Sequence, residues 1–162
     1  MFLENISLRP YNTFGIEANA RRFANIENLD QLRSIVETNK DLFVLSGGSN
    51  ILLTRDIEKP VVHIQLKGIE VIPINDSDHT LVRVQAGENW HEFVTWCIAN
   101  DLGGLENLSL IPGQVGPSPM QNLGAYGVEI TDVFHEREAL EIESGSRGKF
   151  AAKDGRVGGR GA

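Results

Sequence analysis

The sequence predicts an α+β fold made of two subdomains. Segments with strand periodicity and segments with helix periodicity are mixed along the chain, without the strict strand–helix–strand alternation of a parallel α/β protein. The composition is 41% hydrophobic and 23% charged, as in ordinary globular domains. The dipeptide Lys59-Pro60 interrupts the pattern, and we expect the two subdomains to join there.

The first subdomain is predicted over residues 1–59. Its first 25 residues show little periodicity apart from a turn near Pro10. Apolar residues then recur at helical spacing and predict a helix over 29–38, with Asn28 as its N-cap. Two short apolar runs, 42–45 and 51–53, predict buried strands on either side of a polar loop.

The second subdomain is predicted over residues 60–143. Candidate strands are residues 61–65, 68–74, 81–86 and 138–143. The apolar stripe from Trp90 to Ile98 predicts a helix over 89–100, which we expect to end at a glycine near Gly103-Gly104 in the left-handed conformation. A loop rich in proline and glycine follows over 107–127.

Residues 144–162 form a basic tail. They contain five basic residues, one acidic residue and six of the 17 glycines, so the rest of the chain carries a net charge of −11. With Phe150 as its large apolar residue, the tail cannot bury enough surface to offset its ordering entropy. We expect it to be disordered or foreign to the fold, with an Arg/Gly-type nucleic-acid-binding arm as the alternative.

Composition and charge also exclude several classes of protein. The net charge of −7 disfavours a general nucleic-acid binder, and we expect no nucleic-acid partner. No run of 18 apolar residues or basic, apolar leader is present, so we expect no membrane segment or secretion. The single cysteine, Cys97, fits a reducing compartment and a cytoplasmic location. The four histidines lack ligand spacing, so we expect no metal.

The polar loop Ser46-Gly47-Gly48-Ser49-Asn50 is the first candidate binding site. Its glycines allow a sharp turn and a close approach of the backbone to a ligand. Successive backbone N–H groups in such a turn form a concave anion site, which suits a diphosphate. A tight hairpin turn without a ligand is the alternative, and the loop lacks both the P-loop and the Rossmann pattern.

The long loop over 111–127 is the second candidate. A loop of this length without regular structure is usually functional or disordered, and its prolines stiffen this one. Ser118, Gln121 and Asn122 offer hydroxyl and amide groups that suit the edge of a flat heterocycle. An ordered omega loop that only closes the core is the alternative.

Together these segments resemble the UDP-N-acetylenolpyruvoylglucosamine reductase family, the flavoenzymes that make UDP-N-acetylmuramate for peptidoglycan. The resemblance begins at Arg9-Pro10-Tyr11-Asn12-Thr13-Phe14-Gly15 and continues through 45–52 and 86–90. It is most specific from Gly104 to Glu129, which includes Pro119-Met120-Gln121-Asn122-Leu123-Gly124-Ala125-Tyr126-Gly127. It covers residues 5–145 of the chain.

The resemblance implies an FAD-binding module of the vanillyl-alcohol-oxidase (PCMH) type, with two α+β subdomains of which the second is incomplete. It implies that the FAD diphosphate binds backbone amides of Gly47, Gly48, Ser49 and Asn50. It also implies that the flavin ring and ribityl chain contact Gly113, Val115, Gly116, Ser118, Pro119, Gln121, Asn122, Gly124 and Ala125.

The family reaction passes a hydride from NADPH to FAD and then to the enolpyruvyl double bond of a UDP-sugar. The family uses an arginine in a Tyr-Arg-Asp-Ser stretch, a proton-donating serine and a late glutamate. These residues and the substrate domain have no counterpart here, so we expect no catalytic residue and no turnover by these 162 residues alone. The alternatives are an FAD-binding fragment that catalyses nothing and an inert gene remnant.

Overall fold

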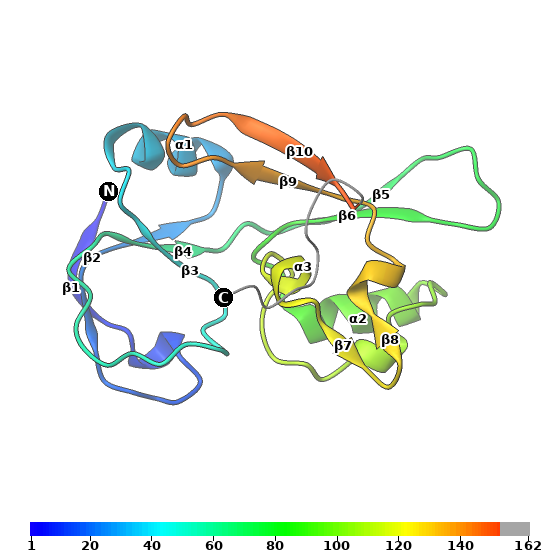
Figure 1. The fold of residues 1–162 in the computed structure, drawn as a ribbon, viewed down its shortest axis with the longest axis horizontal. Helices are drawn as coiled ribbons and strands as arrows, with labels where there is room; N and C mark the ends of the chain where they lie inside the picture. Colours follow the sequence, from blue (N-terminus) through cyan, green and yellow to red (C-terminus); the bar gives the residue numbers. More distant parts are fainter. Residues whose placement is uncertain (153–162) are drawn as a thin grey trace. The chain divides into compact units, whose positions relative to one another are not determined.

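The computed structural model describes residues 1–152 and divides the chain into two compact units (Figure 1). Unit 1 contains Met1–Leu66 and Leu140–Ser146, and unit 2 contains Lys67–Ala139 and the described residues from Arg147 onward. The predicted boundary at 59/60 differs from the division at 66/67. Residues 61–64 lie before the division because they form a strand of the sheet in unit 1.

A four-stranded mixed sheet forms the centre of unit 1. In spatial order its strands are β1 (Leu3–Ser7), β2 (Asn19–Ile26), β4 (Val61–Ile64) and β3 (Phe43–Leu45). β1 runs antiparallel to β2, whereas β2 and β3 both run parallel to β4. The helix α1 (Leu29–Thr38) is therefore the crossover between two strands of the same direction.

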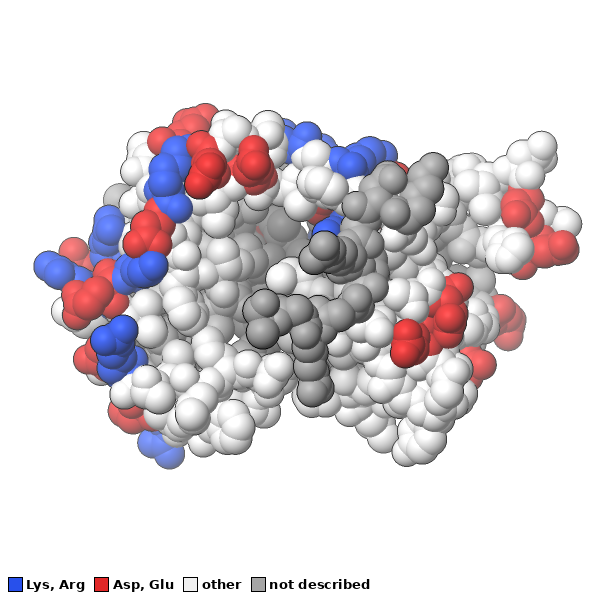
Figure 2. All heavy atoms as spheres, in the orientation of Figure 1, with Lys and Arg blue, Asp and Glu red and all other residues white. Residues whose placement is uncertain are grey.

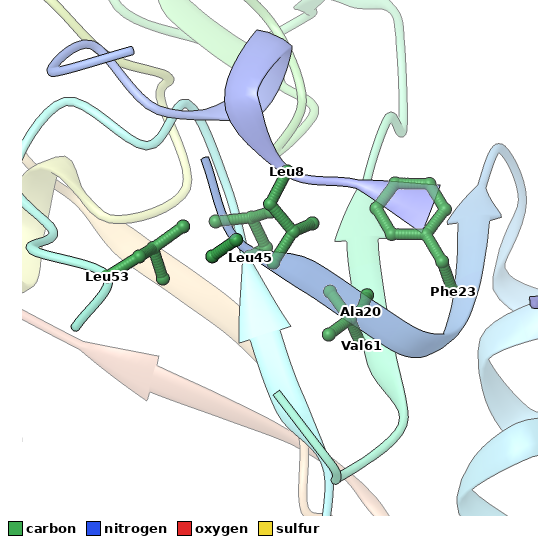
Figure 3. Packing of buried hydrophobic residues seen from close by; sticks show 7 residues of the cluster. Leu8, Ala20, Phe23, Leu45, Leu53 and Val61 are labelled. Carbon is green, nitrogen blue, oxygen red and sulfur yellow. The ribbon is translucent and has the colours of Figure 1, made fainter. Parts of the chain in front are cut away.

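Both faces of this sheet are covered, as the complete burial of the consecutive residues Val61 and Val62 shows. Ala24, Ile26 and Val62 pack with Leu32 and Ile35 of α1. The opposite face packs against the N-terminal turn and the segment after β3 (Figure 3). Its buried cluster consists of Leu8, Ala18, Ala20, Phe23, Leu45, Leu53 and Val61.

Some elements of unit 1 follow the sequence prediction and others do not. The helix over 29–38 is confirmed, and the Asn28 Oδ1 atom accepts from the Gln31 backbone N–H at 3.0 Å. The strand predicted over 51–53 is wrong, because this segment is buried through Leu53 alone and belongs to no ladder among the described residues. β1 and β2 lie in the part for which no strand was predicted.

Unit 2 is built around the helix α2 (Trp90–Ala99). Its core contains the buried residues Trp90, Phe93, Val94, Cys97, Leu105, Leu108 and Ile130. The antiparallel pair β5 (Ile69–Ile72) and β6 (Leu81–Val84) adds partly buried aliphatic side chains to it. Smaller elements follow, namely α3 (Ser118–Gln121), β7 (Gly124–Ala125) and β8 (Val128–Glu129).

The end of α2 differs from the prediction of a glycine cap. Asp101, directly after the C-cap residue Asn100, takes the left-handed conformation with φ of 56°. Aspartate tolerates this region better than most residues, so the helix ends before the glycines are reached. Neither α1 nor α2, at 10 residues each, nor any other helix within 1–152 is long and apolar enough to cross a membrane.

The last two strands, β9 (Glu136–Leu140) and β10 (Arg147–Ala151), form a two-stranded sheet. The strand predicted over 138–143 corresponds to β9, which begins and ends earlier in the chain. β10 lies within residues 144–162, which were predicted to be a tail without regular structure. Its basic residues face acidic partners on β9: Arg147 pairs with Glu138, and the Lys149 Nζ atom lies 3.0 Å from the Glu136 Oε1 atom. Residues 153–162 of that tail lie outside the described residues.

Candidate functional site

The first candidate loop, residues 46–50, follows β3 in unit 1. Gly48 has φ of 62°, and a Cβ atom there would lie 1.9 Å from the Tyr11 carbonyl oxygen. Only glycine therefore fits, because the loop packs directly against the backbone of the N-terminal turn. The Gly48 carbonyl accepts two hydrogen bonds from Thr13, one from the backbone N–H at 3.1 Å and one from Oγ1 at 2.9 Å.

The N-terminal turn that supports this loop is itself rigid. Asn12 is buried, its Nδ2 donates to the carbonyls of Leu8 and Ile16 at 2.8 and 3.0 Å, and its Oδ1 accepts from the Ile16 N–H at 2.9 Å. The Tyr11 ring packs against Phe23 and His63, with both pairs of ring centroids 4.9 Å apart. The loop thus rests on groups fixed by the sheet.

His63 lies on β4 beneath this turn and is almost fully buried. Its Nδ1 lies 2.9 Å from the Asn25 Oδ1 atom, and its Nε2 lies 2.9 Å from the Gln65 Nε2 atom. Because an amide oxygen only accepts and an amide nitrogen only donates, the neutral ring carries its proton on Nδ1. Burial lowers the pKa of His63, in keeping with that neutral form.

The second candidate loop lies in unit 2, where residues 113–116 run beside residues 86–90. The backbone N–H groups of Val115 and Gly116 donate to the carbonyls of Glu88 and Ala86, both at 2.9 Å, and the Trp90 N–H donates to the Gly113 carbonyl at 3.0 Å. A Cβ atom on Gly116 would lie 2.9 Å from the Ala86 Cβ atom. Glycine there lets the two segments come this close.

Glu88 is the residue of this segment whose role the sequence did not reveal. Its Oε1 atom accepts from the Gly68 backbone N–H at 2.6 Å, and its Oε2 atom lies 3.5 Å from the Lys67 Nζ atom. Its side chain is 17% exposed. Glu88 therefore links the start of the β5–β6 pair to the second loop through its side chain and backbone.

Ser118 and Pro119 begin α3 and are both buried. The Ser118 hydroxyl donates to the Val115 carbonyl at 2.6 Å, and its own carbonyl accepts from the Leu123 N–H at 3.3 Å. These bonds fold the loop back on itself. Ser118 therefore shapes the loop from within, and the exposed Gln121 and Gly124 present its surface.

Asn122 ends α3 in the left-handed conformation, with φ of 42°. Its Nδ2 donates to the Glu129 Oε2 atom at 3.1 Å, which fixes the orientation of the amide. Its Oδ1 is buried and has no hydrogen-bond partner among the described residues. An acceptor left without a donor costs free energy, and such an atom fits a position meant for a bound group.

The predicted site residues thus fall into two groups, each described within its own unit. Gly47, Gly48, Ser49 and Asn50 lie in unit 1, whereas the nine from Gly113 to Ala125 lie in unit 2. Neither loop, 46–50 or 111–127, contains a lysine or arginine. An anion there would be held by backbone N–H groups and polar side chains. Within residues 1–152, no group of three side chains suits a metal ion.

Charged side chains of unit 1 are paired rather than gathered by sign. In Figure 2, basic and acidic side chains lie next to one another over this unit. Two of the ion pairs are Arg21–Glu58 at 3.2 Å and Lys59–Asp41 at 2.6 Å. On the face shown, the surface of unit 1 is therefore mixed in charge.

Comparison with known proteins gives matches that span both loops. The family described as "FAD binding domain" matches residues 21–147. The UDP-N-acetylenolpyruvoylglucosamine reductase of Flavobacterium johnsoniae is 54% identical over 142 residues, which are 86% of this chain and 42% of that protein. The protein of the same name from Neisseria meningitidis is 52% identical over 141 residues, or 85% of this chain and 40% of that protein.

Among solved structures, the UDP-N-acetylenolpyruvylglucosamine reductase of Thermus caldophilus matches with a TM-score of 0.74 at 23% identity. The match covers 94% of this chain and 54% of that one. It confirms the predicted α+β fold class. The chain spans less than half the length of the two curated relatives named above.

Proposed function

The chain belongs to the FAD binding domain family, and from that premise we propose that it forms the flavin-binding part of a UDP-N-acetylenolpyruvoylglucosamine reductase. One observation carries the proposal: both candidate loops lie within the matched residues 21–147, and both present backbone rather than charged side chains. Reductase activity is proposed for the longer protein, because this chain spans 42% of the Flavobacterium johnsoniae relative.

We propose that residues 47–50 hold the diphosphate of FAD. The positive φ of Gly48 and its close approach to Tyr11 determine the backbone conformation of the loop. The Gly48 carbonyl oxygen accepts a hydrogen bond from the Thr13 hydroxyl. Backbone N–H groups supply the attraction that a charged side chain would supply elsewhere. This arrangement lets an acidic chain, with a net charge of −7, take an anionic cofactor.

We propose that the loop over 113–125 holds the flavin ring and ribityl chain. The orphaned Asn122 Oδ1 atom would accept from a ring N–H or a ribityl hydroxyl, and Glu129 keeps the amide in that orientation. Val115 and Ala125 offer partly buried apolar surface to the ring. Gly113, Gly116, Gln121 and Gly124 complete the proposed lining, and the buried Ser118 and Pro119 support it from within the loop.

When bound, FAD would supply hydride transfer, with NADPH as donor and an enolpyruvyl UDP-sugar as acceptor. The residues of this chain would bind and orient the cofactor. No catalytic residue is assigned within these 162 residues, so the UDP-sugar and its chemistry need the substrate domain of the longer protein. A cytoplasmic location belongs to the same proposal.

The proposal is tested by purifying residues 1–162 and measuring flavin absorbance and fluorescence quenching, with and without added FAD. We expect one FAD per chain. Asn122→Gly should weaken binding because it removes both the acceptor and the bond to Glu129 without straining the left-handed backbone. Gly103→Ala is the matched control, since a Cβ atom there would meet nothing within 4 Å. A folded chain that takes up no FAD would overturn the proposal.

A further inference from the structure

Thr13 lies 35 positions before Gly48 of the proposed diphosphate loop, and it hydrogen-bonds to that loop at one atom. Both its backbone N–H and its Oγ1 donate to the Gly48 carbonyl oxygen, at 3.1 and 2.9 Å. The same oxygen therefore receives two hydrogen bonds from one residue. Thr13 is exposed, so these bonds are not a consequence of its burial in the core.

The position of Thr13 is fixed independently of the loop. Asn12, its neighbour, is 6% exposed and makes three hydrogen bonds within the turn. Tyr11, which precedes Asn12, packs against the rings of Phe23 and His63. Thr13 is thus a donor whose neighbours in the turn hold it in place.

Holding this carbonyl matters because glycine gives the loop freedom to change. A peptide next to a glycine at positive φ rotates easily, and rotation of the 48–49 peptide would exchange the places of its C=O and N–H groups. The peptide is trans, so the two groups point in opposite directions. A carbonyl turned toward a diphosphate would repel it.

We propose that Thr13 is a positioning residue for the diphosphate of FAD: by holding the Gly48 carbonyl, it keeps the 46–50 loop in its anion-binding conformation. This inference rests on the proposed function, which supplies the anion. Thr13 acts through Gly48 and needs no contact with the cofactor itself. It also explains why the N-terminal turn and the loop, distant in sequence, are built against each other.

The experiment compares Thr13→Val with Thr13→Ser in the full 162-residue chain. Valine has the shape of threonine and removes only the Oγ1 donor, whereas serine keeps it. Loss of one hydrogen bond predicts an FAD dissociation constant about fivefold higher for Thr13→Val. Thr13→Ser should stay within about twofold of wild type. Thr38→Val is the matched control, because it also removes a hydroxyl that donates to backbone carbonyls in unit 1.

Fluorescence titration with FAD gives the affinities, and urea midpoints show whether each variant is as stable as wild type. Weaker binding by Thr13→Val, restored in Thr13→Ser at equal midpoints, supports the inference. Equal affinity of all variants overturns it, as does an equal loss in Thr13→Ser or a loss that tracks the urea midpoint. A folded wild type that binds no FAD overturns the proposed function and this inference together, so the two failures are distinguishable.

Discussion

The two candidate loops are held in their conformations by different kinds of contact. The loop over 46–50 is short and is held by the N-terminal turn, through the Tyr11 contact and the two bonds from Thr13. The loop over 111–127 is held within its own unit, by backbone bonds to residues 86–90 and by buried residues such as Ile130. The short glycine loop is held by a segment distant in sequence, whereas the long loop contributes apolar side chains of its own to the core of its unit.

Each unit can be followed separately, which makes this comparison testable. The two tryptophans, Trp90 and Trp96, both lie in unit 2, so their fluorescence reports on that unit. Amide exchange at β2 and β4 reports on unit 1. The variants below apply both measurements to changes in one loop at a time.

The largest effect is expected from Gly48→Val in the first loop. A Cβ atom there would overlap the Tyr11 carbonyl, and valine is strained at φ of 62°. We expect a loss of about 3 kcal/mol or more in the free energy of unfolding of unit 1. Gly15→Ala is the control, since Gly15 has the same φ but nothing within 4 Å; its cost should be about 1 kcal/mol.

This prediction separates support of the loop from contact with a ligand. If Gly48→Val keeps the exchange protection of β2 and β4 and loses only FAD, then the glycine serves the cofactor and the Tyr11 contact adjusts. If protection is lost before any FAD is added, the glycine is required by the fold.

A smaller effect is expected from Gly116→Val in the second loop. The new side chain would displace Ala86, whose Cβ and carbonyl oxygen would lie 2.9 and 3.0 Å from its Cβ atom. We expect a loss of about 2 kcal/mol, read from tryptophan fluorescence during urea unfolding. Gly103→Ala should change the midpoint little. A Gly116→Val protein as stable as wild type would show that the second loop is not held by residues 86–90.

Trp90→Phe should cost somewhat less. The Trp90 Nε1 atom donates to the Leu108 carbonyl at 2.7 Å in the core of unit 2, and phenylalanine leaves that buried carbonyl without its donor. We expect a loss of about 1.5 kcal/mol, measured by circular dichroism in urea. Trp96→Phe, at a half-buried ring, should cost less. Equal losses in both variants would mean that ring size rather than the hydrogen bond matters.

The smallest effect is a pH dependence confined to unit 1. Burial lowers the pKa of His63 below its unfolded value, so the unfolded chain takes up a proton at higher pH than the folded chain does. Stability should therefore fall as pH decreases below about 6.5 and through the folded pKa. The groups that contact the His63 ring are Asn25, Gln65, Tyr11 and Phe23, and none of them carries a charge near neutral pH. Urea midpoints from pH 7.5 to 5 measure the slope, which His63→Gln should reduce.

The sequence predicts elements whose signal is local. The helix over 29–38 was predicted to its ends because an apolar stripe and the Asn28 cap agree. β2 was not predicted, since its buried residues Ala20, Phe23, Ala24 and Ile26 do not alternate with exposed ones, and Arg21 and Arg22 interrupt the apolar run. The strand over 51–53 is wrong because Leu53 is buried by packing rather than by pairing.

The candidate site shows the same division between local and distant signals. The glycines at 47–48 and the polar residues at 118–122 were recognisable from the sequence because their types suit backbone approach and hydrogen bonding. The bonds from Thr13 and the link from Glu88 to Gly68 join residues 35 and 20 positions apart. The spacing of those residues in the sequence does not predict that they are in contact.

Residues 140–146 group with unit 1 although the chain on both sides of them groups with unit 2. One contact of this segment with the rest of unit 1 is the hydrogen bond that the Lys40 Nζ atom donates to the Ile142 carbonyl oxygen at 3.1 Å. The polypeptide therefore passes from one unit to the other three times, after residues 66, 139 and 146. In genetic terms, a single crossover between two related genes cannot exchange either unit whole.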